Sequence, residues 1–167
     1  PKSYPDLPAI EGVRFATAEA GIKYKNRTDV LLMVFAEGTT VAGVLTRSQC
    51  SSAAVELCRE TLVNGVARGL VVNSGNSNAF TGMKGRESVR HITKVAAQAL
   101  GCAPSEVFID QTGVIGELID ASKFDGVLDE TATRMNELPW IEPAKAIMTT
   151  DTFPKLSGAL LEIDGVE

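Results

Sequence analysis

Residues Val107-Phe108-Ile109-Asp110-Gln111-Thr112-Gly113-Val114-Ile115-Gly116 form a short apolar run that leads into a polar turn and small residues. The run Val107-Phe108-Ile109 predicts a buried strand, and the apolar periodicity further along predicts a helix. Thr112 and Gly113 are therefore expected at a strand-to-helix turn, where backbone N–H groups point outward without partners. Such a turn can hold an anion, so this stretch predicts both a strand–helix unit and a candidate site.

The segments on either side alternate between strand and helix patterns in the same way. The expected elements are strands at 30–35, 41–45 and 70–72, a helix from Ser51–Ser52 to Asn64-Gly65, a helix from the polar loop 73–82 to Gly101, a long helix over 124–138 stopped by Pro139, and a short helix over 143–148. This mixed order indicates a layered α/β fold. We expect one domain over residues 1–167, with 1–11 as an extended lead-in, because three prolines among the first eight residues exclude a helix.

A last strand is expected at 160–163, followed by the two-residue hairpin turn Asp164-Gly165. Only Val166 and Glu167 follow this turn, so the sequence is expected to stop in the middle of a hairpin. Truncation, a disordered continuation or proteolytic processing would each explain such an end.

Composition excludes several classes of function. The formal net charge is −5 and the Lys and Arg residues are scattered, which argues against a nucleic-acid partner. No apolar run approaches the roughly 20 residues of a membrane-spanning helix, and no signal peptide is recognisable, so a cytoplasmic protein without a membrane partner is expected. Cys50, Cys58 and Cys102 lack C-x-x-C spacing and are expected as buried free thiols. No metal-ligand motif is present, and neither a metal nor a cofactor is predicted.

Thr112 and Gly113 are the first candidates for a catalytic role. The chain has one histidine and no Ser-His-Asp arrangement, so its chemistry depends on hydroxyls, amides and a group supplied from elsewhere. A hydroxyl and a backbone N–H aimed at the oxygen of a tetrahedral intermediate form an oxyanion hole, in which each donor contributes about 3 kcal/mol. Gly113 lets a substrate carbonyl approach the backbone because it has no Cβ. The alternative interpretation is an ordinary helix N-terminus.

Two further segments are candidates for substrate binding. Thr149, Thr150 and Asp151 place two hydroxyls and a carboxylate in a short space, which suits a polar, charged amino acid. A C-cap followed by a turn is the alternative for this segment. Asn76 and Asn78 belong to a loop of small polar residues that leaves backbone amides accessible to a ligand. The alternative here is a surface loop without a binding role.

Four ordered motifs together resemble one enzyme family. They are Gly43-Val44-Leu45-Thr46-Arg47, Asn73 to Gly82, Thr112 to Gly116, and Ala146 to Lys155. From about Gly12 to its end, the chain is similar to the α chain of the arginine-biosynthetic ornithine acetyltransferases, also called glutamate N-acetyltransferases. The resemblance implies an α+β layered sandwich whose sheets are completed by a separate β chain. It also implies a precursor that cleaves itself and an α2β2 heterotetramer.

The resemblance further implies the reaction. In this family the N-terminal Thr of the β chain is the nucleophile and its own α-amine is the general base, so no histidine is needed. The acetyl group passes from N2-acetylornithine to this threonine and then to glutamate in a ping-pong sequence, and some members also accept acetyl-CoA as a co-substrate. By the same resemblance, Thr112 and Gly113 form the oxyanion hole and Thr149 binds substrate. Further candidates for substrate binding are Thr150, Asp151, Asn76 and Asn78.

The chain departs from the family pattern in two places. Gln111 stands where members usually carry Ser, which is expected to alter the approach to the oxyanion hole without removing a donor. The stretch that precedes the nucleophilic Thr in the family does not follow Glu167, and Pro1 has no nucleophilic side chain, so the nucleophile is expected on the β chain. Two other functions stay open: a self-processing amidohydrolase or aminopeptidase that passes the acyl group to water, and a non-catalytic module that binds a small metabolite.

Overall fold

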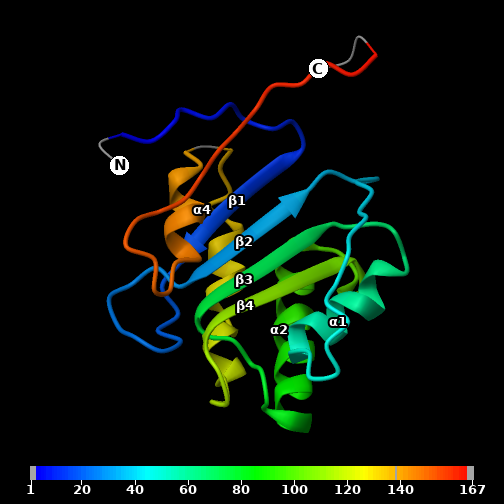
Figure 1. Cartoon of the computed structure of the whole chain (residues 1–167), viewed down its shortest axis with the longest axis vertical. Coiled ribbons are helices and arrows are strands. Elements are labelled where there is room, and N and C mark those ends of the chain that lie inside the picture. Colours follow the sequence, from blue (N-terminus) through cyan, green and yellow to red (C-terminus); the bar gives the residue numbers. More distant parts are fainter. Residues whose placement is uncertain (1–2, 138, 165–167) are drawn as a thin grey trace.

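A four-stranded sheet forms the centre of the computed structural model, which describes residues 3–137 and 139–164 (Figure 1). The strands are β1 (Val13–Ala18), β2 (Val30–Phe35), β3 (Gly69–Asn76) and β4 (Val107–Val114), and they lie in this order across the sheet. β2 pairs antiparallel with both β1 and β3, whereas β3 and β4 pair in parallel. Within the described part of the chain, β1 and β4 are therefore the edge strands.

Helices cover the two faces of this sheet unequally. The helical elements are α1 (Ala53–Leu62), α2 (Gly82–Leu100), η1 (Pro104–Glu106), η2 (Ala121–Phe124), α3 (Val127–Ala132) and α4 (Ile141–Ala146). α1, α2, η2 and α3 pack around one core on one face, and α4 contacts β1 and β2 on the other. As a result, Phe108 and Thr112 of β4 are half-buried on this second face and Asp110 is exposed.

Side-chain alternation along the strands produces two separate cores. The larger core lies on the side of α2 and includes the fully or almost fully buried Val30, Leu32, Val71, Ile92, Ile109, Phe124 and Leu128. Each large apolar side chain buried in this way contributes about 1.5–3 kcal/mol. The smaller core lies on the side of α4, where the rings of Phe15 and Trp140 have centroids 5.0 Å apart.

The ends of the first two helices agree with the sequence predictions. The side chain of Ser52 accepts a hydrogen bond from the N–H of Val55 at 3.3 Å, which caps α1. α2 ends at Gly101, whose φ of 68° is the left-handed conformation that closes a helix. Local capping signals therefore predicted the start of α1 and the end of α2.

The predicted lengths of β3 and β4 are wrong. β4 continues through Thr112 and Gly113 to Val114, so this pair lies within a strand and not at a strand-to-helix turn. β3 likewise continues to Asn76, so the first part of the expected loop is strand. The parallel ladder explains both extensions, because each strand supplies the other with backbone partners that the local sequence does not reveal.

Two shorter elements also differ from expectation. Residues 41–45 form no strand, and the neighbouring Thr40 makes only an isolated bridge to Val66. The short helix expected over 143–148 begins two residues earlier and ends at Ala146 as α4.

The long helix expected over 124–138 is replaced by η2 and the short helix α3. Gly126 separates them with a φ of 73°, a conformation that an uninterrupted α-helix does not contain. The last expected position, Leu138, lies outside the described residues. Residues 160–162 have no regular structure in place of the expected strand, and the hairpin beyond Asp164 also lies outside the described residues.

The first and last described segments lie beside each other near α4 (Figure 1). Residues 3–10 have no regular structure, and the indole N–H of Trp140 donates to the carbonyl oxygen of Pro8 at 2.8 Å. A cavity of about 730 Å³ lies between this segment, Trp140 and residues 157–160. Among the described helices, none is long and apolar enough to cross a membrane.

Candidate functional site

Two glycines face each other near the ends of β3 and β4. Gly75 and Gly113 are partners in the parallel ladder, with φ angles of 120° and 132°. A Cβ atom on Gly113 would lie 2.3 Å from the carbonyl oxygen of Gly75, a separation that no side chain can adopt. Gly113 is therefore required both by its backbone conformation and by the space around it.

Thr112 lies next to this glycine pair, on the half-open face of the sheet. Its ladder partner is Ser74, which is buried and donates from Oγ to the carbonyl oxygen of Ala146 at 2.8 Å. Ala146 is the last residue of α4 and lies three residues before Thr149. This hydrogen bond brings the segment that carries Thr149 to the strand pair that carries Thr112, although the two are far apart in the sequence.

The backbone around Gly113 has one side toward β3 and the other toward the outer edge of the sheet. The N–H of Gln111 donates to the carboxylate of Asp110 at 2.9 Å and so takes no part in the ladder. The carbonyl oxygen of Val114 accepts from the N–H of Ser77 at 2.9 Å. Because N–H groups alternate between the two sides of a strand, the N–H of Gly113 is expected at the same outer edge as that of Gln111.

Amide side chains form a chain of hydrogen bonds around the Thr112–Gly113 pair, and two of them, Gln111 and Asn73, lie on the face opposite Thr112, since neighbouring side chains of a strand point to opposite faces. Nε2 of Gln111 donates to Oδ1 of Asn73 at 2.8 Å, and Nδ2 of Asn73 donates to the carbonyl oxygen of Asn76 at 3.1 Å. Nδ2 of Asn76 donates to the carbonyl oxygen of Glu117 at 3.4 Å. These bonds connect the residues before and after the Thr112–Gly113 pair. They also give Gln111 a structural position behind the pair.

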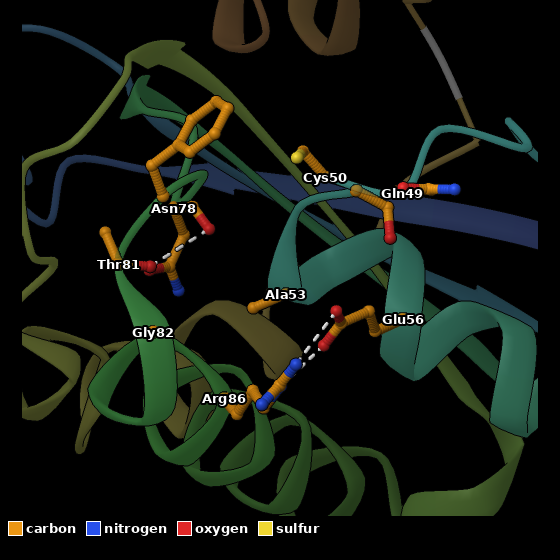
Figure 2. A pocket seen from close by; sticks show the side chains of 10 residues that line it. Gln49, Cys50, Ala53, Glu56, Asn78, Thr81, Gly82 and Arg86 are labelled. Atoms are coloured by element: carbon orange, nitrogen blue, oxygen red, sulfur yellow. Dashed lines mark hydrogen bonds and ion pairs between the residues drawn. The ribbon is translucent and has the colours of Figure 1, made fainter.

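Asn78 lies at a small pocket between the starts of α1 and α2 (Figure 2). The pocket has a volume of about 200 Å³. Nδ2 of Asn78 donates to the carbonyl oxygen of Gly85 at 3.1 Å, and its Oδ1 accepts from Oγ1 of Thr81 at 2.6 Å. Figure 2 also shows Arg86 paired with Glu56, and this guanidinium lowers the pKa of the Glu56 carboxyl. The side chain of Asn78 is thus occupied by bonds within the protein.

The segment after α4 forms a charged turn around Thr149. The N–H of Thr149 donates to the carboxylate of Asp151 at 3.4 Å, and Asp151 also pairs with Lys155. Lys155, and then the N–H of Thr149, hold the pKa of Asp151 below its ordinary value. Thr150 is exposed beside them. Nη2 of Arg27 donates to the carbonyl oxygen of Met148, so this segment is also tied to the loop between β1 and β2.

Arg27 was not among the predicted site residues. Its signal in the sequence is the basic stretch from Lys23 to Arg27, which is typical of a solvated turn. Cys50 is exposed, which corrects its expected burial, while Cys58 and Cys102 are half-buried free thiols. Within the described ranges, no group of three or more His, Cys, Asp or Glu side chains is arranged to hold a metal ion.

Solved structures give the class to which this arrangement belongs. The fold is similar to that of ornithine acetyltransferase from Mycobacterium tuberculosis, determined in complex with ornithine, with a TM-score of 0.80 and 31% identity over 85% of this chain and 78% of that chain. It is also similar to the arginine biosynthesis bifunctional protein ArgJ from Bacillus halodurans, with a TM-score of 0.76 and 26% identity over 85% of this chain and 74% of that chain. The chain therefore has the mixed α/β fold of the ornithine acetyltransferases.

Sequence comparison identifies the family. The ArgJ family model matches residues 14–167, and the chain belongs to the ArgJ family. It is 58% identical over 167 residues to the arginine biosynthesis bifunctional protein ArgJ of Rhizobium meliloti and 60% identical over 166 residues to that of Agrobacterium fabrum. These matches cover 100% and 99% of this chain, but the chain spans only 40% of the length of each relative. The family inferred from the four motifs is thus confirmed.

Proposed function

We propose that this chain is the α subunit of an acetyltransferase that moves the acetyl group of N2-acetylornithine to glutamate in arginine biosynthesis. Membership of the ArgJ family supports the reaction. The observation that carries the role of this chain is the position of Thr112 and Gly113, a hydroxyl and a side-chain-free backbone near the end of an edge strand, beside the segment of Thr149.

Thr112 and Gly113 form the oxyanion hole of the proposed reaction. The nucleophilic Oγ of a β-chain N-terminal Thr attacks the acetyl carbonyl of N2-acetylornithine, and the α-amine of the same Thr accepts its proton. The hydroxyl of Thr112 and the N–H of Gly113 donate to the oxyanion of the tetrahedral intermediate. The intermediate collapses to the acetyl-enzyme and ornithine, whose amine takes the proton. The amine of glutamate then attacks the acetyl-enzyme through the same two steps.

Thr149 binds the amino-acid part of the substrate in this proposal. Its N–H and the carboxylate of Asp151 are already engaged with each other, so its hydroxyl is the group available for the substrate. Thr150 and Asp151 lie in the same turn and contribute polar groups at the edge of the proposed substrate site. Asn76 supports the loop behind the oxyanion hole through its bond to Glu117, and Asn78 supports the start of α2.

The β chain is the proposed partner, and the exposed apolar side chains support its presence. Phe80 is 72% exposed, Met83 63%, Ile115 61% and Leu118 50%. Ala79 and Gly116 are joined by a backbone hydrogen bond of 2.9 Å, so the loop of Phe80, which leads into α2 with Met83, lies beside the loop of Ile115 and Leu118 beyond the ends of β3 and β4. A patch of this kind is typical of a protein–protein contact. We name Phe80, Met83, Ile115 and Leu118 the apolar end. The proposed assembly is an α2β2 heterotetramer.

Acetyl-CoA is proposed as a second acetyl donor of this enzyme.

The test is mass spectrometry of the complete protein before and after incubation with N2-acetylornithine. We expect a co-purifying chain that begins with Thr and gains one acetyl group, which is lost when glutamate is added. Release of free acetate at a rate independent of glutamate would instead identify an amidohydrolase. Absence of both a second chain and a covalent acetyl group would favour a metabolite-binding module.

A further inference from the structure

The loop between β1 and β2 is held firmly in place. Asp29 is 2% exposed, and its carboxylate accepts from the N–H of Ala20 at 2.7 Å and from the N–H of Ile22 at 2.6 Å. Nζ of Lys123 donates to the carbonyl oxygen of Gly21 at 2.6 Å. These bonds satisfy backbone groups of residues 20–22 from within the loop and from η2, and so anchor the first part of the loop.

This loop contacts both segments of the candidate site (Figure 1). Near the oxyanion pair, Lys23 packs so closely on Gly75 that a Cβ there would lie 2.9 Å from the Cβ of Lys23, and Lys23 also pairs with Glu117. Near the second segment, Nη2 of Arg27 donates to the carbonyl oxygen of Met148, the residue before Thr149. The loop therefore contacts Gly75, the ladder partner of Gly113, and also the residue before Thr149.

Arg27 carries a positive charge that no acidic side chain of the described residues pairs with. The nearby acids are already engaged, Glu117 with Lys23 and Asp151 with Lys155. The side chain of Arg27 is half-buried, and one of its five N–H donors is used by the Met148 carbonyl oxygen. A half-buried guanidinium with free donors is well suited to bind a carboxylate through two parallel hydrogen bonds.

We propose that Arg27 binds the α-carboxylate of the amino-acid substrate, beside Thr149. This inference rests on the proposed function and extends it by assigning the group that recognises the carboxylate. In N2-acetylornithine, the α-carboxylate and the acetylated nitrogen are attached to the same carbon, so a carboxylate site must lie close to the oxyanion hole. Glutamate carries the same group next to its attacking amine. One arginine therefore serves both the acetyl donor and the acceptor of a ping-pong reaction.

The test compares two acetyl donors that differ only in this group, using the complete enzyme. N-acetylputrescine is N2-acetylornithine with the carboxylate replaced by hydrogen. We expect Arg27→Gln to lower kcat/KM for N2-acetylornithine by about 10- to 100-fold, mainly through KM, and to change kcat/KM for N-acetylputrescine by less than about 3-fold. Arg27→Lys, which keeps the charge, should recover part of the loss. The inhibition constants of ornithine and putrescine, measured as competitive inhibitors, compare binding with and without the carboxylate for ligands that donate no acetyl group.

Arg68→Gln is the matched control. Arg68 is also half-buried and donates to a backbone carbonyl oxygen, that of Phe35 at 3.3 Å, but it lies at the opposite ends of β2 and β3. We expect this variant to treat both donors as the wild type does. An equal loss on both donors in Arg27→Gln, or no loss on either, would overturn the carboxylate site. The wild-type enzyme is assayed before any variant. If it transfers no acetyl group from N2-acetylornithine, the proposed function itself is overturned.

Discussion

Thr112 is the side chain whose removal should affect catalysis most directly. It is half-buried on the open face of β4. Thr112→Ala is expected to lower kcat of the complete enzyme by about 10²-fold or more, because one donor to the oxyanion is lost. Thr112→Ser keeps the hydroxyl and should retain most of the activity. Steady-state kinetics with a thermal melt of each variant would check this, and an unchanged kcat in Thr112→Ala would rule out the oxyanion role.

Cys58 gives a prediction for alkaline pH. Its thiol donates to the carbonyl oxygen of Ile109 at 3.1 Å, and burial raises its pKa above the ordinary value of 9.0. The unfolded chain therefore ionises this thiol at a lower pH than the folded chain does. Its contribution to stability is present below pH 9.0 and is lost as the pH rises through the raised pKa. Urea unfolding between neutral and alkaline pH should show a smaller alkaline loss in Cys58→Ala than in the wild type, whereas Cys50→Ala, at an exposed thiol, should follow the wild type.

Among the strands, the close approach of β3 and β4 at the Gly75–Gly113 pair depends on Gly113. Gly113→Ala would place a Cβ 2.3 Å from the Gly75 carbonyl oxygen, so the two strands would have to separate. We expect a loss of at least 2–3 kcal/mol of stability, roughly the scale of overpacking a filled site. Gly116→Ala is the control, because its φ of 79° is also positive but nothing lies within 4 Å of its Cβ position. Its cost should be only about 1 kcal/mol. Equal denaturation midpoints for the two variants would contradict the steric argument.

The helix ends and the β3–β4 pair show which features the local sequence can predict and which it cannot. Ser52 and Gly101 predicted the start of α1 and the end of α2 correctly, because capping acts between near neighbours. Thr112 and Gly113 were wrongly assigned to a turn, since their strand conformation depends on pairing with β3. Arg27 could not be found at all, because its partner Met148 is 121 residues away in the sequence. Contacts between distant segments thus account for most of the differences.

The protein as a single body is closed on one side and open on the other. α1, α2 and α3 seal the core on one face, whereas β4 is an edge strand with half-buried side chains on the second face within the described residues. Thr112 and Gly113 lie on this open side, and the apolar end lies just beyond them. Relatives such as that of Rhizobium meliloti are longer, with this chain spanning 40% of their length. The remainder of such a protein is the natural candidate to cover β4 and the apolar end.

Phe80 provides the test of that assembly. Its ring is 72% exposed, and its φ of 58° is costly for a bulky residue, by about 1–2 kcal/mol, so the fold holds an aromatic side chain outside its own core. Phe80→Glu should leave the α chain folded but weaken its association with the β chain by about 10-fold or more, because a charge would replace a ring that the β chain covers in the proposed assembly. Val63→Glu is the control, since Val63 is 85% exposed at the other end of α1. Size-exclusion chromatography across a dilution series should show earlier dissociation for Phe80→Glu alone, and activity should return at high protein concentration because association is restored by mass action. Identical dissociation of both variants would place the β chain on another surface.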